Sequence, residues 1–317
     1  MGAALGLSER TRGRTAPNPN VGCVLVQHGR IVGRGWTQAG GRPHAEAMAL
    51  AEAGEKSRGA TCCVTLEPCA HLSPRGPACA DLLVAAGVVR VVIALGDPDP
   101  RTNGQGVARL RDAGIEVEEG IAEEAARAAM AGFLTRRAKG RPFVTLKLAT
   151  SLDGRIALES GESRWITGPE ARAHAHLERA RHEAILVGGR TWEVDRPKLD
   201  VRLPGLEPRS PRRILLSRHP RFRGDDGWEL LGAPSDIVHL EGVDHLLVEG
   251  GAETAAAFLR EGLVDRLLLY RAPILIGSGK PALGDIGLSD LAAAHGRWRL
   301  GDTRMLGSDR LEVYATS

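Results

Sequence analysis

His44-Ala45-Glu46, followed by Pro68-Cys69 and then by Cys79, is the part of this chain that decides its fold and its chemistry. One histidine and two cysteines can hold zinc and leave a fourth position open for water. A glutamate two residues after the histidine can carry protons without binding the metal. The pattern predicts zinc ligands at His44, Cys69 and Cys79 and a catalytic Glu46. Such a metal would activate water for attack on a ring carbon that bears an amino group.

The segments around these residues place the ligands at the ends of secondary-structure elements. Residues 60–66 form a β-rich run, and Pro68 ends it just before Cys69. His44 precedes a helical run over residues 45–53. The alternative interpretation is that His44 caps a helix and that the cysteines are small core residues. The conjunction of the two motifs favours the metal site, and hydrolytic deamination is the leading hypothesis.

The first half of the chain has the pattern of a layered α/β domain. Strand and helix runs from residue 21 to residue 95 follow the order β-β-α-β-α-β. Helices over 105–113 and 122–137 and a short strand at Ile115 complete this domain. Lys-Gly-Arg-Pro at 139–142 marks a boundary. We therefore expect two domains, over residues 1–140 and 141–317.

The second half is also expected to be α/β. Its expected elements are strands at 143–149, 184–187, 213–216 and 245–249 and helices at 169–181 and 254–261. Glycine pairs follow two of these strands, at Gly188-Gly189 and Gly250-Gly251, where backbone amides can approach a phosphate at a helix N-terminus. Each pair is equally typical of a tight turn, and the Rossmann fingerprint is missing. Residues 202–213 and 220–228, rich in Pro, Gly and charge, are predicted surface loops.

The composition indicates a soluble globular protein. Apolar residues make up 43% of the 317 residues, and the net charge of +3 is too small for a nucleic-acid footprint. No apolar run approaches the roughly 18 residues of a membrane span, and the N-terminus is too short for a signal peptide. The five cysteines all precede residue 80, which fits metal binding in the cytoplasm better than a disulfide framework. Cys23, Cys62 and Cys63 are expected in the core.

These motifs carry a resemblance to a known family. Together with Pro-Asn-Pro-Asn-Val-Gly at 17–22, the long loop between the two ligand cysteines resembles the deaminase half of the bifunctional deaminase/reductases of riboflavin biosynthesis. The segments at 147–155, 161–167 and 248–251 resemble signature segments of the reductase half. The resemblance covers nearly the whole chain. The loop between the cysteines is one residue longer than the commonest family form.

The resemblance implies a cytidine-deaminase-like three-layer domain followed by a dihydrofolate-reductase-like α/β domain that binds NADPH. It implies deamination of 2,5-diamino-6-ribosylamino-4(3H)-pyrimidinone 5′-phosphate and then reduction of the ribosyl side chain to ribityl. The matching cofactor positions are Ala149, Trp165, Thr191, Asp195, Ser217, Gly251, Ala252, Glu253 and Thr254, with the following residues to Ala257. The matching substrate positions are Ser163, Arg179, Leu199, Arg202 and Glu249, and Asn18 is expected to orient the ring or ribose. Further candidates for substrate contacts are His71, Arg75 and Asp99.

Elementary chemistry supports part of this assignment and leaves alternatives open. Arg179 and Arg202 can offer forked donors to phosphate oxygens. With 42 Lys and Arg in the chain, however, an isolated arginine is more often a solvated surface residue, and Trp165 is equally typical of a packing anchor. A homo-oligomer, a dimer or tetramer, is expected.

Four other functions compete with the bifunctional one. They are a monofunctional deaminase with an impaired reductase domain, a reductase with a decayed deaminase half, a nucleic-acid-editing deaminase and a zinc-stabilised binding module. Only 3% of the residues are aromatic, which disfavours nucleic-acid editing. Between Ser217 and Val248 the chain is shorter than is usual in the family. A helix is therefore expected to be missing, one side of the sheet should need another cover, and NADPH binding should be weakened.

Overall fold

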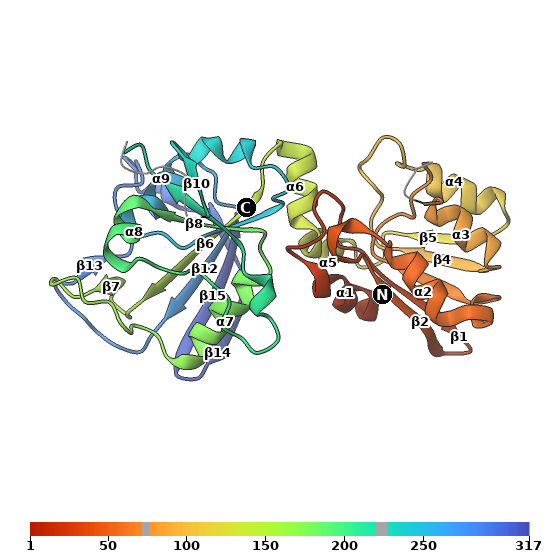
Figure 1. Ribbon diagram of the computed structural model, residues 1–317, viewed down its shortest axis with the longest axis horizontal. Coiled ribbons are helices and arrows are strands. Elements are labelled where there is room, and N and C mark those ends of the chain that lie inside the picture. The colour runs from red at the N-terminus through yellow and green to blue at the C-terminus, as the bar shows by residue number, and fades with distance from the viewer. Residues whose placement is uncertain (72–75, 220–226, 317) are drawn as a thin grey trace. The chain divides into compact units, whose positions relative to one another are not determined.

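The chain consists of two compact units, Met1–Lys139 and Gly140–Ser317, each built on its own sheet (Figure 1). The structure is a computed structural model, and it describes residues 1–71, 76–219 and 227–316.

The first unit has a five-stranded sheet in the order β2-β1-β3-β4-β5. Its strands are β1 Gly22–Gln27, β2 Arg30–Trp36, β3 Thr61–Val64, β4 Arg90–Ile93 and β5 Glu116–Glu119. β1 pairs antiparallel with β2 and β3, whereas β3, β4 and β5 run parallel. The helices are α1 Gly2–Ser8, α2 Ala45–Ala53, α3 Cys79–Ala85, α4 Gln105–Asp112, α5 Glu123–Ala129 and α6 Ala131–Lys139. Short 3₁₀ helices are η1 Glu9–Thr11, η2 Ala39–Gly41 and η3 Gly54–Ser57.

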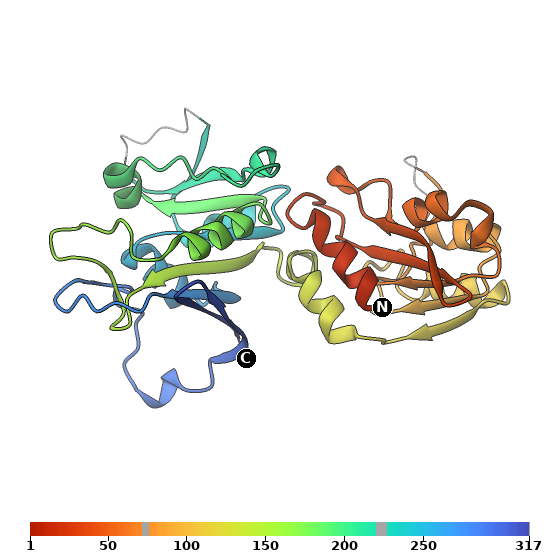
Figure 2. The same ribbon diagram turned by 90° about the horizontal axis from the view of Figure 1, so that it is seen from below.

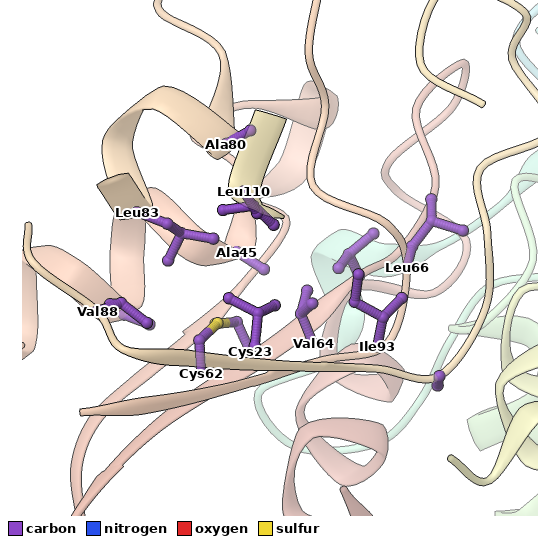
Figure 3. Packing of buried hydrophobic residues seen from close by; sticks show 14 of the residues in the cluster. Cys23, Ala45, Cys62, Val64, Leu66, Ala80, Leu83, Val88, Ile93 and Leu110 are labelled. Atoms are coloured by element: carbon purple, nitrogen blue, oxygen red, sulfur yellow. The ribbon is translucent and has the colours of Figure 1, made fainter. Parts of the chain in front are cut away.

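Helices cover both faces of this sheet, which gives the three layers expected from the sequence (Figure 2). Cys23 and Leu25 of β1 point into the main core, which α2, α3 and α4 cover, and Figure 3 shows Cys23 beside Cys62 and Val64 in that core. Val24 points to the opposite face, where it packs against α1. The alternation along β1 therefore assigns its side chains to two faces, as the strand period requires.

Two glycines of β2 allow α2 to lie close to the sheet. A Cβ atom on Gly35 would lie 1.9 Å from the carbonyl oxygen of Ala45, and one on Gly33 would lie 2.2 Å from that of Ala49. Any larger residue would therefore push the helix outwards. Because α2 begins directly after His44, these glycines also fix the depth at which that histidine sits.

Two details of the first unit differ from the sequence prediction. The prediction of a single helix over 122–137 is wrong. The structure has two helices, α5 and α6, separated at Met130, whose φ of −105° and ψ of 19° are not helical. Met130 is fully buried in the core, and Gly132 weakens the helical propensity just beyond it. The sequence analysis also missed α1, whose Ala4 and Leu7 are buried.

The second unit has an eight-stranded sheet in the order β10-β9-β8-β11-β6-β12-β15-β14. Its strands are β6 Phe143–Thr150, β8 Ala184–Gly188, β9 Arg212–Leu216, β10 Trp228–Leu231, β11 His245–Val248, β12 Arg266–Arg271, β14 Trp298–Leu306 and β15 Asp309–Thr316. The first six in the sheet order are parallel, and β15 and β14 add antiparallel pairs at one edge. A separate small sheet pairs β7 Arg155–Ala157 with β13 Lys280–Pro281.

Helices lie on both faces of the large sheet. The helices are α7 Pro169–Arg179, α8 Gly189–Asp195 and α9 Ala252–Arg260. Leu186 and Leu246 share a core with Phe258 of α9, whereas Ile185 and Leu247 pack with Trp192 of α8 on the other side. The helix α7 packs over the β12 and β15 end of the sheet through Ala171. Central strands are thus buried on both faces, as is usual for parallel sheets.

The sequence prediction for the second unit was incomplete. It contained the cores of β6, β8, β9, β11, α7 and α9 but no strand after residue 261, no β7 or β10, and no α8. Residues 207–209, predicted as loop, form the 3₁₀ turn η4 Glu207–Arg209. Of the predicted loop at 220–228, residues 220–226 lie outside the described part of the chain, and the prediction is wrong for Trp228, which begins a strand.

The shortened stretch between Ser217 and Val248 has its own cover. β10 adds a parallel strand beside β9, and η5 Pro234–His239 follows it. Pro234 and Ile237 of η5 are buried, and Ile237 packs in the same core as Ile214 and Phe258. A short 3₁₀ segment therefore covers the apolar surface that the missing helix was expected to leave open.

Candidate active sites

The three predicted metal ligands converge in the first unit. The ligand atoms of His44, Cys69 and Cys79 all lie within 4.8 Å of one another. Nδ1 of His44 lies 3.3 Å from Sγ of Cys79 and 3.6 Å from Sγ of Cys69. His44 is the N-cap of α2 and Cys79 is the first residue of α3, so two helix N-termini point at the cluster. The positive ends of the helix dipoles favour a thiolate there. That thiolate is Cys69, because the hydrogen bond between the two cysteines, together with burial, raises the pKa of the Cys79 thiol.

The electrostatics of this cluster suit metal binding and proton transfer. A hydrogen bond from the Cys79 thiol lowers the pKa of Cys69 to about 4, and the backbone amide of Cys79, 3.3 Å from Sγ of Cys69, acts in the same direction. Glu46 is 4% exposed, and this burial raises the pKa of its carboxyl to about 7 while the charge of His44 opposes the rise. A carboxyl with such a pKa can both accept and donate a proton near neutral pH.

A small pocket opens onto this cluster. His44, Glu46 and Cys69 line it together with Asn18 and Asp97. The side-chain nitrogen of Asn18 lies 3.3 Å from Nε2 of His44 and donates to the carbonyl oxygen of Gly41 at 3.1 Å. Asn18 therefore forms part of the pocket wall and also holds the metal ligand. The remaining described lining residues are Pro19, Val21, Thr37, Leu66 and Glu67.

The three further substrate candidates do not line this pocket within the described part of the chain. Nδ1 of His71 lies 3.2 Å from Oγ1 of Thr102. Asp99 is 8% exposed and forms ion pairs with Arg101 and Arg137. Arg75 lies outside the described residues. It is Asp97, which the sequence analysis did not select, that lines the pocket.

The second unit carries a larger pocket, of about 760 Å³, along α7, α8 and the segment after α8. Predicted cofactor and substrate positions meet in its wall. They are Ala149, Ser163, Trp165, Arg179, Thr191, Asp195, Leu199, Arg202 and Glu249. A volume of this size is typical of a small-molecule or cofactor site.

A buried ion pair forms the floor of this pocket. Arg179 donates from Nε and Nη2 to the two carboxylate oxygens of Glu249, at 2.8 and 2.9 Å, and from Nη1 to the carbonyl oxygen of Asp200 at 3.0 Å. Nζ of Lys147 lies 3.8 Å from the same carboxylate. Burial would raise the pKa of Glu249, but the charges of Arg179 and Lys147 outweigh it and lower the pKa to about 2.

The geometry changes the interpretation of two predicted residues. Three of the five N–H donors of Arg179 serve Glu249 and Asp200, and these include the fork formed by Nε and Nη2, whereas Arg202 is 63% exposed at the pocket wall. Trp165 is 64% exposed, with the Arg172 guanidinium 4.6 Å from its ring centroid. The packing-anchor interpretation of Trp165 is therefore wrong.

The remaining predicted cofactor positions lie outside the lining of this pocket. Ser217 follows β9, and Gly251, Ala252, Glu253 and Thr254 lie at the start of α9. Thr254 is buried, and its Oγ1 would lie 2.1 Å from a Cβ atom on Gly188. A Cβ atom on Gly250 would similarly lie 2.4 Å from Cβ of Thr254. Thr254 thus packs between the two glycine turns, which neighbouring strands β8 and β11 bring together.

Several polar residues of the pocket were missed by the sequence analysis. They are Lys147, Arg172, His176 and Lys198. Lys147 lies in a segment that carried the family resemblance, which was the one available signal. The other three are ordinary polar residues in sequence, and only the fold brings them to the pocket.

Both sites fit the groups that the sequence implies. A histidine and two cysteines with sulfur and nitrogen atoms within 4.8 Å form a donor set that suits zinc with an open position. The pocket of the second unit joins exposed cations at Arg202 and Lys198 to Val187 and Glu249, which lie at the carboxyl ends of the parallel strands β8 and β11. Such edges commonly bind phosphorylated cofactors.

Comparison with known proteins assigns a class to each unit. Residues 1–95 match the family described as "Cytidine and deoxycytidylate deaminase zinc-binding region", and residues 142–229 and 236–311 match "RibD C-terminal domain". The fold and the sites define a zinc-dependent deaminase domain joined to an NADPH-dependent reductase domain. The expected fold classes and cofactors are confirmed.

The comparisons also identify the particular family. Riboflavin biosynthesis protein RibD from Escherichia coli is 40% identical over 98% of this chain and 96% of its own length, and RibD from Aquifex aeolicus is 39% identical over 92% and 90%. The chain belongs to the RibD family of bifunctional deaminase/reductases of riboflavin biosynthesis.

Comparison with solved structures gives the same family. Acinetobacter baumannii RibD matches with a TM-score of 0.86 at 37% identity, and a Thermotoga maritima diaminohydroxyphosphoribosylaminopyrimidine deaminase/5-amino-6-(5-phosphoribosylamino)uracil reductase matches with 0.89 at 34%. Both matches cover 100% of this chain and 97% of the other. Among the described residues, no helix has the length and hydropathy of a membrane span.

Proposed function

We propose that the first unit deaminates 2,5-diamino-6-ribosylamino-4(3H)-pyrimidinone 5′-phosphate and that the second unit reduces the ribosyl side chain of the product to ribityl with NADPH. The observation that carries the proposal is the convergence of His44, Cys69 and Cys79 within 4.8 Å, with Glu46 lining the same pocket. The family membership of both units supports the order of the two reactions.

In the deaminase site, each residue has a separate task. Zinc, when bound by His44, Cys69 and Cys79, supplies a Lewis acid that lowers the pKa of water to roughly 7. Glu46 takes a proton from the attacking water on a carboxylate oxygen and passes it to the departing amine. Asn18 keeps the imidazole of His44 in place and presents its amide to the ring or ribose.

In the reductase site, the protein binds, aligns and excludes water. NADPH, when bound, supplies the hydride. Ala149, Trp165, Thr191 and Asp195 are proposed cofactor contacts in the pocket wall, and Ser217 and residues 251–254 remain proposed contacts at the adjoining strand ends. For the substrate, Ser163, Leu199 and Arg202 supply wall contacts, and the Arg179–Glu249 pair supplies a rigid polar floor.

The alternative is a monofunctional deaminase with an impaired reductase domain. The shortened segment before β11 motivated that alternative. The apolar surface there is covered by η5. The predicted cofactor and substrate residues named above also line the large pocket, so the bifunctional proposal is favoured. We further propose that the functional boundary lies at residues 140–141, that the enzyme works in the cytoplasm, and that it forms a homo-oligomer.

Incubation with the diaminopyrimidine ribosyl phosphate, with and without NADPH, tests the proposal by product mass. Ammonia release without NADPH and a further gain of two hydrogens with NADPH are expected. Glu46→Gln should keep about one zinc per chain and lose ammonia release, whereas Cys79→Ser should lose zinc. Glu52→Gln, on the exposed side of the same helix, is the matched control. Normal ammonia release by Glu46→Gln would refute the assignment of the proton carrier.

A further inference from the structure

Glu67 lies between the end of β3 and the metal ligand Cys69, and it has no role in the chemistry described so far. Its side chain is 3% exposed. One carboxylate oxygen, Oε1, accepts hydrogen bonds from the backbone amides of Gly106 at 2.9 Å and Val107 at 3.1 Å. The other, Oε2, accepts from those of Gly104 at 3.1 Å and Asp97 at 3.3 Å. A carboxylate has about four acceptor directions, so these four amides use its full capacity.

The four amides belong to the loop after β4 and to the start of α4. Gly104, the N-cap of α4, has no side chain to cap the helix, and its φ is 76°. Glu67 takes over this task from a distant part of the chain, because it accepts the second and third amides of the helix. The contact is also close in space: a Cβ atom on Gly106 would lie 2.1 Å from the carbonyl oxygen of Pro68.

The same contacts shape the deaminase pocket. Both Glu67 and Asp97 line it, next to His44 and Cys69. A second bond joins the same two loops, since Nδ1 of His71 lies 3.2 Å from Oγ1 of Thr102. The wall formed by Asp97 therefore depends on how firmly residues 97–107 are held against the segment that carries Cys69.

We propose that Glu67 is a positioning residue of the deaminase reaction, which holds residues 97–107 against the metal-ligand loop and thereby sets the fit of the pyrimidine ring. The inference rests on the proposed deaminase function. A proton-carrying role is unsuited to Glu67, because backbone amides occupy its acceptor directions. Glu67 is also outside the described cluster of potential metal ligands.

The test is Glu67→Gln in the full-length zinc-loaded enzyme. Glutamine offers a single acceptor oxygen, so its NH₂ group must face two of the four amides. The loop therefore loses two of the four hydrogen bonds that fix it to residue 67. We expect about one zinc per chain, kcat for ammonia release within about threefold of wild type, and a KM raised about tenfold. Gly106→Ala disturbs the same contact from the helix side and should raise KM in the same way.

Asp81→Asn is the matched control, because it removes an exposed ion pair between α3 and α4 without touching the loop. Its KM should equal that of wild type. Unchanged KM in Glu67→Gln and Gly106→Ala would overturn the proposal. Loss of zinc in Glu67→Gln would also overturn it, because Glu67 would then be needed to keep the metal ligands in place. A wild-type enzyme that releases no ammonia would instead refute the proposed function.

Discussion

The buried pair of Arg179 and Glu249 makes a quantitative prediction about stability. The side chains are 13% and 8% exposed, and two hydrogen bonds join them. The pKa of Glu249 falls from 4.5 to about 2 because attraction to Arg179 and Lys147 exceeds the cost of burial. At about 1.4 kcal/mol per pKa unit, the ionised carboxylate contributes roughly 3 kcal/mol to folding at neutral pH.

The sign of the pH dependence follows from the lowered pKa. The contribution is fully present above the unfolded-state pKa of 4.5 and is lost as the pH falls towards the folded-state value of about 2. At about pH 3.5, the unfolded carboxyl is largely protonated and the folded one is still ionised, so wild type should have lost about 1.4 kcal/mol through this group. Glu249→Gln has no such carboxyl and should lack this part of the pH dependence.

Denaturant unfolding of wild type and Glu249→Gln at about pH 7 and about pH 3.5 measures both effects. At neutral pH the variant should be less stable by roughly 3 kcal/mol, because the Arg179 charge stays buried without its partner. Tryptophan fluorescence is a suitable probe, since the second unit contains all the tryptophans except Trp36. Glu261→Gln, an exposed site after α9, is the control. A loss below about 1 kcal/mol, or parallel pH profiles, would refute the reasoning.

Three other predictions concern packing, separability and cofactor binding. Gly35→Ala should destabilise the first unit by about 1–3 kcal/mol in denaturant unfolding and lower its zinc content, because the new methyl group would clash with the carbonyl oxygen of Ala45. Gly6→Ala is the control and should change neither quantity, because its methyl group would have no atom within 4 Å. Residues 1–140 should bind zinc and release ammonia without NADPH, and a soluble zinc-loaded fragment without activity would contradict a self-contained site. NADPH titration by fluorescence should show saturable binding, because η5 covers the apolar surface that a missing helix would leave open and Ala149, Trp165, Thr191 and Asp195 line the pocket. No binding, with or without the deaminated substrate, would leave a monofunctional deaminase.

Short-range patterns in the sequence predicted the zinc site well. His44 and Glu46 are separated by one residue, and helix α2 begins and ends where the pattern places it. The cysteine ligands flank a loop of nine residues, so a single segment supplies both. Such a site can be predicted from sequence because His44 and Cys79 each lie at the start of a helix whose position the local pattern indicates.

Contacts between distant segments could not be predicted in this way. Arg179 meets Glu249 across 70 residues, and this contact occupies the fork formed by Nε and Nη2 of its guanidinium. Asp97 enters the pocket only because β4 lies beside β3. The edge strand β14 was missed because most of its residues are exposed, so its sequence lacks the buried alternation that marks an inner strand.

Both units place their chemistry at the carboxyl ends of neighbouring parallel strands. In the first unit, Glu67 follows β3 and Asp97 follows β4, and these strands pair in parallel. In the second, Gly188 ends β8 and Glu249 follows β11, which also pair in parallel. At such an edge the chain turns into a loop or helix, so side chains and backbone amides from separate segments meet in a small volume. An acceptor such as Glu67 can therefore bind four amides from one neighbouring loop and helix. Its loss would displace the wall of a pocket whose metal ligands stay in place.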